Sequence, residues 1–201
     1  MKLFRTLLLA GLLLQGCGGA GPALAPLPAD AVILAFGDSL TAGTGAGRGE
    51  SYPAVLSRLS GRTVVNAGVP GEESPAGLDR LPAVLDEAAP DLVILCHGGN
   101  YLLRKRDRSR LKQNVGEMIA LAQQRGIAVV LVGVPAPRLL LSIEPLYAEL
   151  ADRYGIPLED EILPEVLRKA ALKSDPVHPN AGGYALIAER LHELLGDAGA
   201  L

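Results

Sequence analysis

The chain is poor in aromatic residues and cysteine, and neither charge dominates. Its 201 residues include two Phe, five Tyr and no Trp, although 49% are hydrophobic, so the core has to be built from Leu, Val, Ile and Ala. The formal net charge is −3 and there is no polybasic tail, which argues against a nucleic acid partner. No cluster of His, Cys and acidic residues has metal-ligand spacing. We therefore expect a chemistry that needs no metal and no cofactor.

No apolar run is long enough to cross a bilayer, which takes about 20 residues. The apolar run from Thr6 to Leu14 follows Lys2 and Arg5, which is the pattern of a secretory signal. The string Leu14-Gln15-Gly16-Cys17 at its end resembles the lipobox of bacterial lipoproteins, in which cleavage before the cysteine leaves that cysteine acylated. We expect residues 1–16 to be a lipoprotein signal peptide and Cys17 to be lipidated, the alternative being plain secretory cleavage.

The next segment, residues 17–29, is rich in Gly, Ala and Pro and predicts a flexible tether before a single domain over residues 30–201. Two acyl chains on Cys17 would hold the protein at a membrane of the bacterial cell envelope. The residue after the cysteine is Gly18 and not the aspartate that resembles a signal for retention in the inner membrane. A place at the outer membrane, facing the periplasm, is therefore favoured. The alternative for Cys17 is a disulfide with Cys96, but Cys96 ends a strand-like run and is expected to be a buried free thiol.

Apolar runs of strand length alternate with segments of helical period. The expected strands are Ala31–Phe36, Thr63–Asn66, Leu92–Cys96, Ile127–Val132 and a short one near Ile156–Leu158. The expected helices are Tyr52–Leu59, Leu78–Ala88, Leu111–Arg125 and Ala181–Leu195. Continuous hydrophobic strands are typical of a parallel sheet covered on both faces. The pattern predicts an α/β fold, a flavodoxin-like three-layer α/β/α sandwich with a mostly parallel five-stranded sheet.

Residues suited to chemistry follow these strands. Ser39 comes after the first, Gly68–Gly71 after the second and Gly98–Asn100 after the third, while His178 precedes the last helix. Ligands of open α/β sheets bind at the carboxyl edge, where these loops meet. An unperturbed serine hydroxyl is a poor nucleophile, so Ser39 needs a base such as His178, and Asp175 can orient the imidazole. This combination predicts ester hydrolysis.

Four blocks carry a resemblance to a known family. They are Gly37-Asp38-Ser39-Leu40-Thr41-Ala42-Gly43, Val65-Asn66-Ala67-Gly68-Val69-Pro70-Gly71, Gly98-Gly99-Asn100 and Asp175-Pro176-Val177-His178-Pro179-Asn180. The chain resembles the SGNH hydrolases, or GDSL esterases, and within them the thioesterase I, lysophospholipase and arylesterase branch. The resemblance implies a Ser39–His178–Asp175 triad. It also implies an oxyanion hole formed by the amides of Ser39 and Gly71 and the side chain of Asn100.

Two residues depart from that branch. Tyr101 stands where an aspartate is usual, and Pro70 where a small polar residue is common, so loop geometry and substrate choice are affected more than proton transfer. Asp38 is expected to hold its turn by bonding loop amides and not to act as an acid or base. His97 is expected to be satisfied by backbone groups beside a buried strand, and His192 to face solvent.

Two further segments bear on the substrate. Val134–Ile143 is unusually apolar for a loop and either lines an acyl-chain groove or begins the next helix. Arg104–Arg108 is either a contact for an anionic head group or a solvated charged loop. The predicted partners are a small-molecule or lipid ester and the membrane; acyl-CoA is disfavoured for a secreted protein. The alternatives are a polysaccharide O-acetylesterase and a non-catalytic lipid-anchored binding protein on the same fold.

Overall fold

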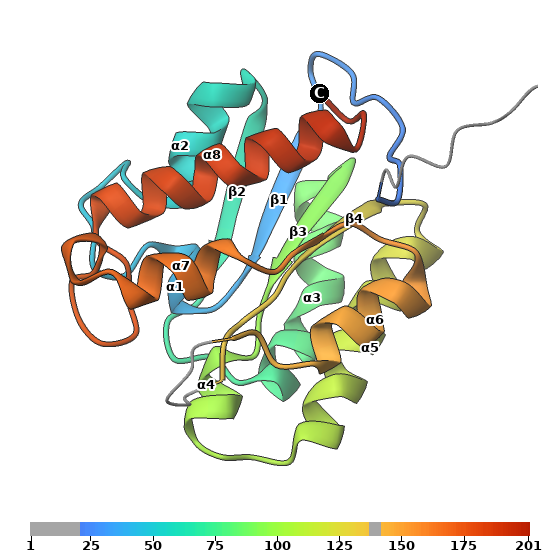
Figure 1. Ribbon diagram of the computed structural model, residues 1–201. Helices are drawn as coiled ribbons and strands as arrows, with labels where there is room; N and C mark the ends of the chain where they lie inside the picture. The colour runs from blue at the N-terminus through green and yellow to red at the C-terminus, as the bar shows by residue number, and fades with distance from the viewer. Residues whose placement is uncertain (1–20, 137–141) are drawn as a thin grey trace, which may run out of the picture.

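The protein, described by a computed structural model over residues 21–136 and 142–201, is built around one five-stranded sheet (Figure 1). The strands are Val32–Gly37 (β1), Thr63–Gly68 (β2), Leu92–Cys96 (β3), Ala128–Val132 (β4) and Leu158–Glu159 (β5). They pair in the order β2-β1-β3-β4-β5, and every pair is parallel. Parallel neighbours require crossover connections, and helices provide them.

Helices cover both faces of the sheet. One layer holds Tyr52–Ser60 (α2), Ile162–Arg168 (α7) and Ala181–Asp197 (α8), with α8 packed against the other two. The opposite layer holds Ser74–Ala88 (α3), Arg108–Gln124 (α5) and Leu146–Tyr154 (α6), with α5 between its neighbours (Figure 1). Two short helices, Ser39–Ala42 (α1) and Gly99–Leu103 (α4), follow β1 and β3 directly. The three-layer α/β/α prediction is confirmed.

The core has the aliphatic composition that the scarcity of aromatic residues predicts. Every residue of β3 is buried, and Ile33, Leu34 and Phe36 of β1 are fully inaccessible. The expectation that all strands are covered on both faces is wrong for β2, whose residues are half-buried or exposed. Because β2 is an edge strand, only one neighbour shields it.

Most predicted elements match the observed ones to within a few residues. The second strand runs two residues further than predicted, and the last strand begins at Leu158, where the sequence suggested its end. Helix α3 begins four residues earlier than predicted, at Ser74, with a proline in its first turn. The start of the next helix was one of two interpretations of Val134–Ile143, but α6 begins at Leu146, and the sequence did not indicate the seven-residue α7.

The amino-terminal segment lies along the last residues of the chain. The amide of Leu24 donates to the carbonyl of Ala198 at 2.8 Å, and the amide of Leu27 donates to that of Ala200 at 2.9 Å. Both leucine side chains also pack against the core. Within the predicted tether of residues 17–29, the part around Leu24 and Leu27 is therefore held to the domain, whereas Cys17 and the predicted signal peptide lie outside the described residues.

Across residues 21–136 and 142–201, no helix combines the length and apolar character needed to cross a bilayer.

Candidate active site

Ser39 is the first residue of α1, directly after β1. Asp38 caps this short helix, because its Oδ1 accepts a hydrogen bond from the amide of Leu40 at 3.1 Å. The Tyr184 hydroxyl of α8 donates to the carbonyl of Thr44 at 2.9 Å and ties the end of the same loop to the helical layer. The nucleophile candidate is 9% exposed and therefore sits on a fixed, almost buried turn.

Helix α1 lies directly on the end of β2. A Cβ atom at Gly68 would overlap the backbone amide of Ala42 and the carbonyl carbon of Thr41. Only glycine allows the two backbones to approach so closely. Gly68 thus sets the distance between the Ser39 loop and the next loop along the sheet edge.

The loop before α8 holds His178 and Asp175. The Nδ1 atom of His178 lies 2.7 Å from Asp175 Oδ2, while Asp175 Oδ1 accepts from the amides of Val177 and His178, each at 2.8 Å. Partial burial alone would raise the pKa of Asp175, but the hydrogen bonds from His178 and the two amides outweigh it and lower that pKa. The ionised carboxylate is the form that accepts from Nδ1–H, which leaves Nε2 free to accept a proton.

The two ends of the chain meet at this point. His178 Nε2 lies 3.0 Å from Ser39 Oγ, across 139 positions of sequence. Ser39, His178 and Asp175 therefore form a continuous hydrogen-bonded relay, as their pattern predicts. The geometry is that of a hydroxyl paired with a base whose other nitrogen is oriented by a carboxylate.

Asn100 belongs to α4 and lines the same cavity as Ser39 and His178. Its Nδ2 lies 3.4 Å from Asp38 Oδ2. Burial raises the pKa of Asp38, against the opposing effects of His97 and of the amides of Leu40, Gly99 and Asn100. The prediction that Asp38 holds a turn is confirmed. Its contact with Asn100 is a second role that nothing in the local sequence indicated.

Gly71 lies in a turn that follows β2 and is closed by a 3.2 Å bond from the amide of Glu72 to the carbonyl of Val69. Its φ is +79°, a conformation that favours glycine, and a Cβ there would meet open space. The left-handed backbone, and not crowding by other protein atoms, therefore accounts for glycine at this position. Pro70, one of the two departures, is exposed in this turn.

A cavity of about 520 Å³ opens beside Ser39. Its polar side is formed by Asp38, Ser39, Asn100 and His178, and the rest is mostly apolar: Leu40, Leu103, Val134, Pro135, Ala136, Leu167, Pro176 and Val177 line it together with Gly99. The start of the apolar segment Val134–Ile143 therefore lines the cavity, and Ile143 pairs with Pro135 in an antiparallel bridge. Its Leu139–Leu141 stretch lies outside the described residues, and the next helix begins only at Leu146.

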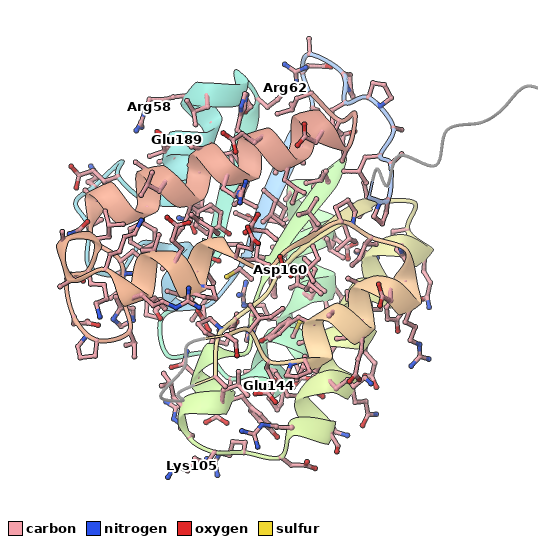
Figure 2. All side chains as sticks on the ribbon, in the orientation of Figure 1. Arg58, Arg62, Lys105, Glu144, Asp160 and Glu189 are labelled. Atoms are coloured by element: carbon pink, nitrogen blue, oxygen red, sulfur yellow. The ribbon has the colours of Figure 1, made fainter. Side chains whose placement is uncertain are left out.

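The basic run after α4 is largely engaged by carboxylates. Arg104 and Arg106 both pair with Glu73, at 2.8 and 3.3 Å, and Arg108 pairs with Glu144 at 2.9 Å. Lys105 lies at the outer tip of the loop (Figure 2). This favours the charged-loop interpretation. Tyr101, the second departure, is 8% exposed and belongs to the hydrophobic core.

The surroundings of the two other histidines, His97 and His192, differ from those expected. The prediction that backbone groups satisfy His97 is wrong: its Nε2 lies 3.0 Å from Glu72 Oε2, and its buried Nδ1 has no partner among the described residues. A partner 25 residues away in sequence could not be identified from the local pattern. His192 is half-buried on α8. Cys96 is a buried free thiol, as expected.

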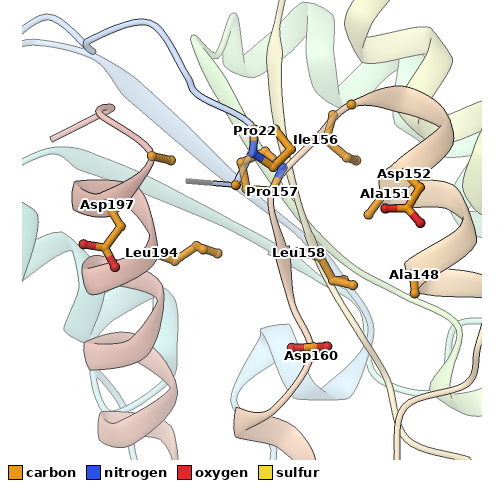
Figure 3. A pocket seen from close by; sticks show the side chains of 13 residues that line it. Pro22, Ala148, Ala151, Asp152, Ile156, Pro157, Leu158, Asp160, Leu194 and Asp197 are labelled. Carbon is orange, nitrogen blue, oxygen red and sulfur yellow. The ribbon is translucent and has the colours of Figure 1, made fainter. Parts of the chain in front are cut away.

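A larger cavity, of about 870 Å³, lies beside β5, between α6 and the carboxyl end of α8 (Figure 3). Pro22, Leu158 and Leu194 form part of its wall, and Asp152 of α6, Asp160 after β5 and Asp197 of α8 line it as well. Its lining contains no Ser, Cys or His, so the described residues offer no hydroxyl or thiol paired with an imidazole there. Among the described residues, no three His, Cys, Asp or Glu side chains are grouped so as to hold a metal ion.

Comparison with known proteins agrees with this geometry. Residues 35–186 match the model of the GDSL-like lipase/acylhydrolase family. Esterase TesA of Pseudomonas aeruginosa is 34% identical over 194 residues, covering 90% of this chain and 94% of its own. Thioesterase 1/protease 1/lysophospholipase L1 of Escherichia coli is 30% identical, covering 78% and 79%. The crystal structure of AlinE4, an SGNH-hydrolase family esterase, superposes with a TM-score of 0.65 at 35% identity, covering 84% and 96%. The chain thus belongs to the GDSL-like lipase/acylhydrolase family and is a carboxylic ester hydrolase.

Proposed function

We propose that the protein is a serine esterase that hydrolyses acyl or aryl esters through a covalent acyl-enzyme. The observation that carries this proposal is the relay in which Ser39 Oγ lies 3.0 Å from His178 Nε2 and His178 Nδ1 lies 2.7 Å from Asp175. Ser39 attacks the ester carbonyl while His178 takes its proton, and Asp175 stabilises the imidazolium. His178 then returns the proton to the departing alcohol.

The second half of the reaction releases the acyl group. Water attacks the Ser39 ester, with His178 again acting as base, and the tetrahedral intermediate collapses to the free acid and Ser39. Both intermediates place negative charge on the former carbonyl oxygen. The amides of Ser39 and Gly71 and the side-chain amide of Asn100 are the proposed donors to it, and loss of one such donor costs about 3 kcal/mol of barrier stabilisation.

The apolar wall of the cavity supports an acyl or aryl group larger than acetyl. Leu103, Val134 and Leu167 surround the space next to Ser39 and offer no charged partner to a substrate. Burial of each CH₂ group against such a wall contributes about 0.8 kcal/mol. Short to medium acyl esters, aryl esters and lysophospholipids fit this description, and thioesters share the chemistry.

Hydrolysis of p-nitrophenyl esters of graded chain length tests the proposal. We expect Ser39→Ala to lower kcat by about 10³-fold or more, while Ser109→Ala, a matched change on the exposed start of α5, has no effect. A fluorophosphonate probe should label the wild type and not Ser39→Ala. Wild-type activity in Ser39→Ala would overturn the mechanism, and absence of both hydrolysis and labelling in the wild type would favour a binding protein. A strong preference for acetyl would favour the polysaccharide O-acetylesterase.

We also propose that a lipid on Cys17 anchors the enzyme in the bacterial envelope, at the outer membrane and facing the periplasm. The support is the lipobox-like string at the end of an apolar run. Cells grown with an alkyne fatty acid should yield labelled protein in the membrane fraction. Cys17→Ser should abolish both labelling and membrane association; retention of either would contradict the anchor.

A further inference from the structure

A half-buried ion pair begins at Glu72, the residue directly after Gly71. The side chain of Glu72 is only 7% exposed, and both of its oxygens are engaged by Arg80 of α3. Arg80 Nε donates to Oε1 at 2.8 Å, and Nη2 donates to Oε2 at 2.8 Å. Such a bidentate pair fixes direction as well as distance, because two parallel bonds resist rotation of the carboxylate.

His97 provides a third contact to the same carboxylate. It is fully buried, and its Nε2 lies 3.0 Å from Glu72 Oε2. Because an ionised carboxylate can only accept, Nε2 carries the proton. The buried Nδ1 has no partner in the described part of the chain, so the ring is held by Glu72 and by stacking on Phe36, whose centroid is 6.0 Å away.

Arg80 links this pair to the ends of two strands. Its Nη2 also donates to the carbonyls of Ala67 in β2 and Gly37 in β1, at 3.0 and 3.4 Å, and its guanidinium carbon lies 4.1 Å from the centre of the Phe36 ring. Glu72 thus connects the ends of the strands that lead to Gly71 and Ser39. His97, which follows β3, contacts the same carboxylate, and the loop after β3 leads to Asn100.

The other side of the turn is held as well. Arg104, at the end of the helix that bears Asn100, donates to the carbonyl of Gly71 at 3.3 Å and to Glu73 at 2.8 Å. Gly71 itself adopts a left-handed conformation and has no side chain to restrain it. The direction of its amide therefore depends on its neighbours, and among these Glu72 has the most buried side-chain contacts.

We propose that Glu72, held by Arg80 and His97, is a positioning residue that aims the Gly71 amide at the developing oxyanion. This rests on the proposed function, in which that amide is a donor. A positioning residue acts on the transition state more than on substrate binding, because the donor is needed where charge develops. Displacement of a catalytic group by about 1 Å can cost about 10²-fold in rate.

The test is Glu72→Gln, which keeps the shape but removes the charge and one acceptor oxygen. We expect kcat for a p-nitrophenyl ester to fall about 10- to 100-fold with KM changed less than about twofold. Affinity for a trifluoromethyl ketone, which forms a tetrahedral adduct, should fall by the same factor as kcat/KM. Affinity for an ether of the same chain length, which has no carbonyl, should not change. Glu87→Gln, an exposed carboxylate on the same helix as Arg80, is the matched control and should behave as the wild type.

An unchanged kcat in folded Glu72→Gln would overturn the proposal, as would an equal loss of affinity for ketone and ether, which indicates collapse of the whole cavity. Arg80→Lys keeps the charge but not the bidentate geometry and carries the same test if the Gln variant is unfolded at the assay temperature. Failure of the proposed function is distinguishable, because the wild type would then hydrolyse no ester or Ser39→Ala would remain active.

Discussion

Asp175, which orients His178, is itself exposed to solvent. Its side chain is 44% exposed, whereas that of His178 is 19% exposed. Exposure weakens the electrostatic benefit of the pair because solvent screens it. Its main contribution is therefore geometric: the carboxylate fixes the tautomer of the imidazole and the direction of Nε2.

We predict that Asp175→Asn lowers kcat for p-nitrophenyl esters by about 10²- to 10⁴-fold. The amide would still accept from the two loop amides through its oxygen, but its NH₂ group would face Nδ1 and favour the wrong tautomer. Steady-state kinetics with Asp152→Asn, an exposed aspartate of α6, as the control would measure the effect. A loss of less than threefold would mean that His178 is oriented without Asp175.

Substitutions of Asp38 can separate its bond to the Leu40 amide from its contact with Asn100. Asp38→Ala removes the cap of α1 and the contact with Asn100, and we predict a loss of about 1–2 kcal/mol in the free energy of unfolding. Asp38→Asn retains an oxygen for the Leu40 amide and should keep most of that stability. Denaturant titration of both variants would measure the difference; equal losses would contradict the capping role.

How much of the site was predictable depends on sequence distance. Ser39, Asp175 and His178 could be identified because each lies in a short motif, and the parallel sheet brings the ends of its strands to one edge. The Glu72–Arg80–His97 cluster was missed because its members come from three elements and none has a local signature. Leu103 and Leu167 look like ordinary core positions, so only the structure assigns them to the cavity.

At the scale of elements, β1 and β3 were predicted well because both faces of each are covered, which gives continuous apolar runs. The same kind of run appears in β2, where it does not reveal an edge position. Helix α7 is seven residues long and contains Pro164, so too few turns are present to establish a helical period. Strand order and short helices thus depend on tertiary packing that no single segment encodes.

The packing of α1 on β2 leads to a prediction at this scale. Gly68→Ala would force α1 away from the sheet, and we predict a loss of about 1–3 kcal/mol in stability. The activity of the folded fraction should also decrease, because α1 carries Ser39. Gly196→Ala is the control, since a Cβ at that position of α8 meets nothing within 4 Å. Thermal unfolding and kcat on the same samples would test it; unchanged values in Gly68→Ala would contradict the close approach.

For the whole molecule, Glu72 links stability to pH. Burial alone would raise its pKa, but hydrogen bonds from His97 and Arg80 outweigh this and lower it from 4.5 to about 2. As the pH falls below 4.5, Glu72 takes up a proton in the unfolded chain before it does so in the folded protein. The contribution of the ionised Glu72 to the free energy of unfolding is complete above pH 4.5 and is lost as the pH falls toward 2.

We therefore predict that the wild type has a higher free energy of unfolding than Glu72→Gln at neutral pH. This difference should decrease between pH 4.5 and 2. Thermal unfolding of both proteins across this range would measure it, with Glu87→Gln as the control for removal of one carboxylate. A gap that stays constant down to pH 2.5 would contradict the lowered pKa.

The docking of Leu24 and Leu27 beside the carboxyl terminus constrains how an anchored enzyme can be oriented. Between Cys17 and Leu24 the chain can extend about 25 Å at most. Leu24 is bonded to Ala198, just after the carboxyl end of α8, whereas His178 lies before the amino end of the same helix. An acylated Cys17 would therefore hold the mouth of the catalytic cavity toward the aqueous side. With such an anchor, esters in the surrounding solution would reach Ser39 more readily than lipids of the leaflet that holds the acyl chains.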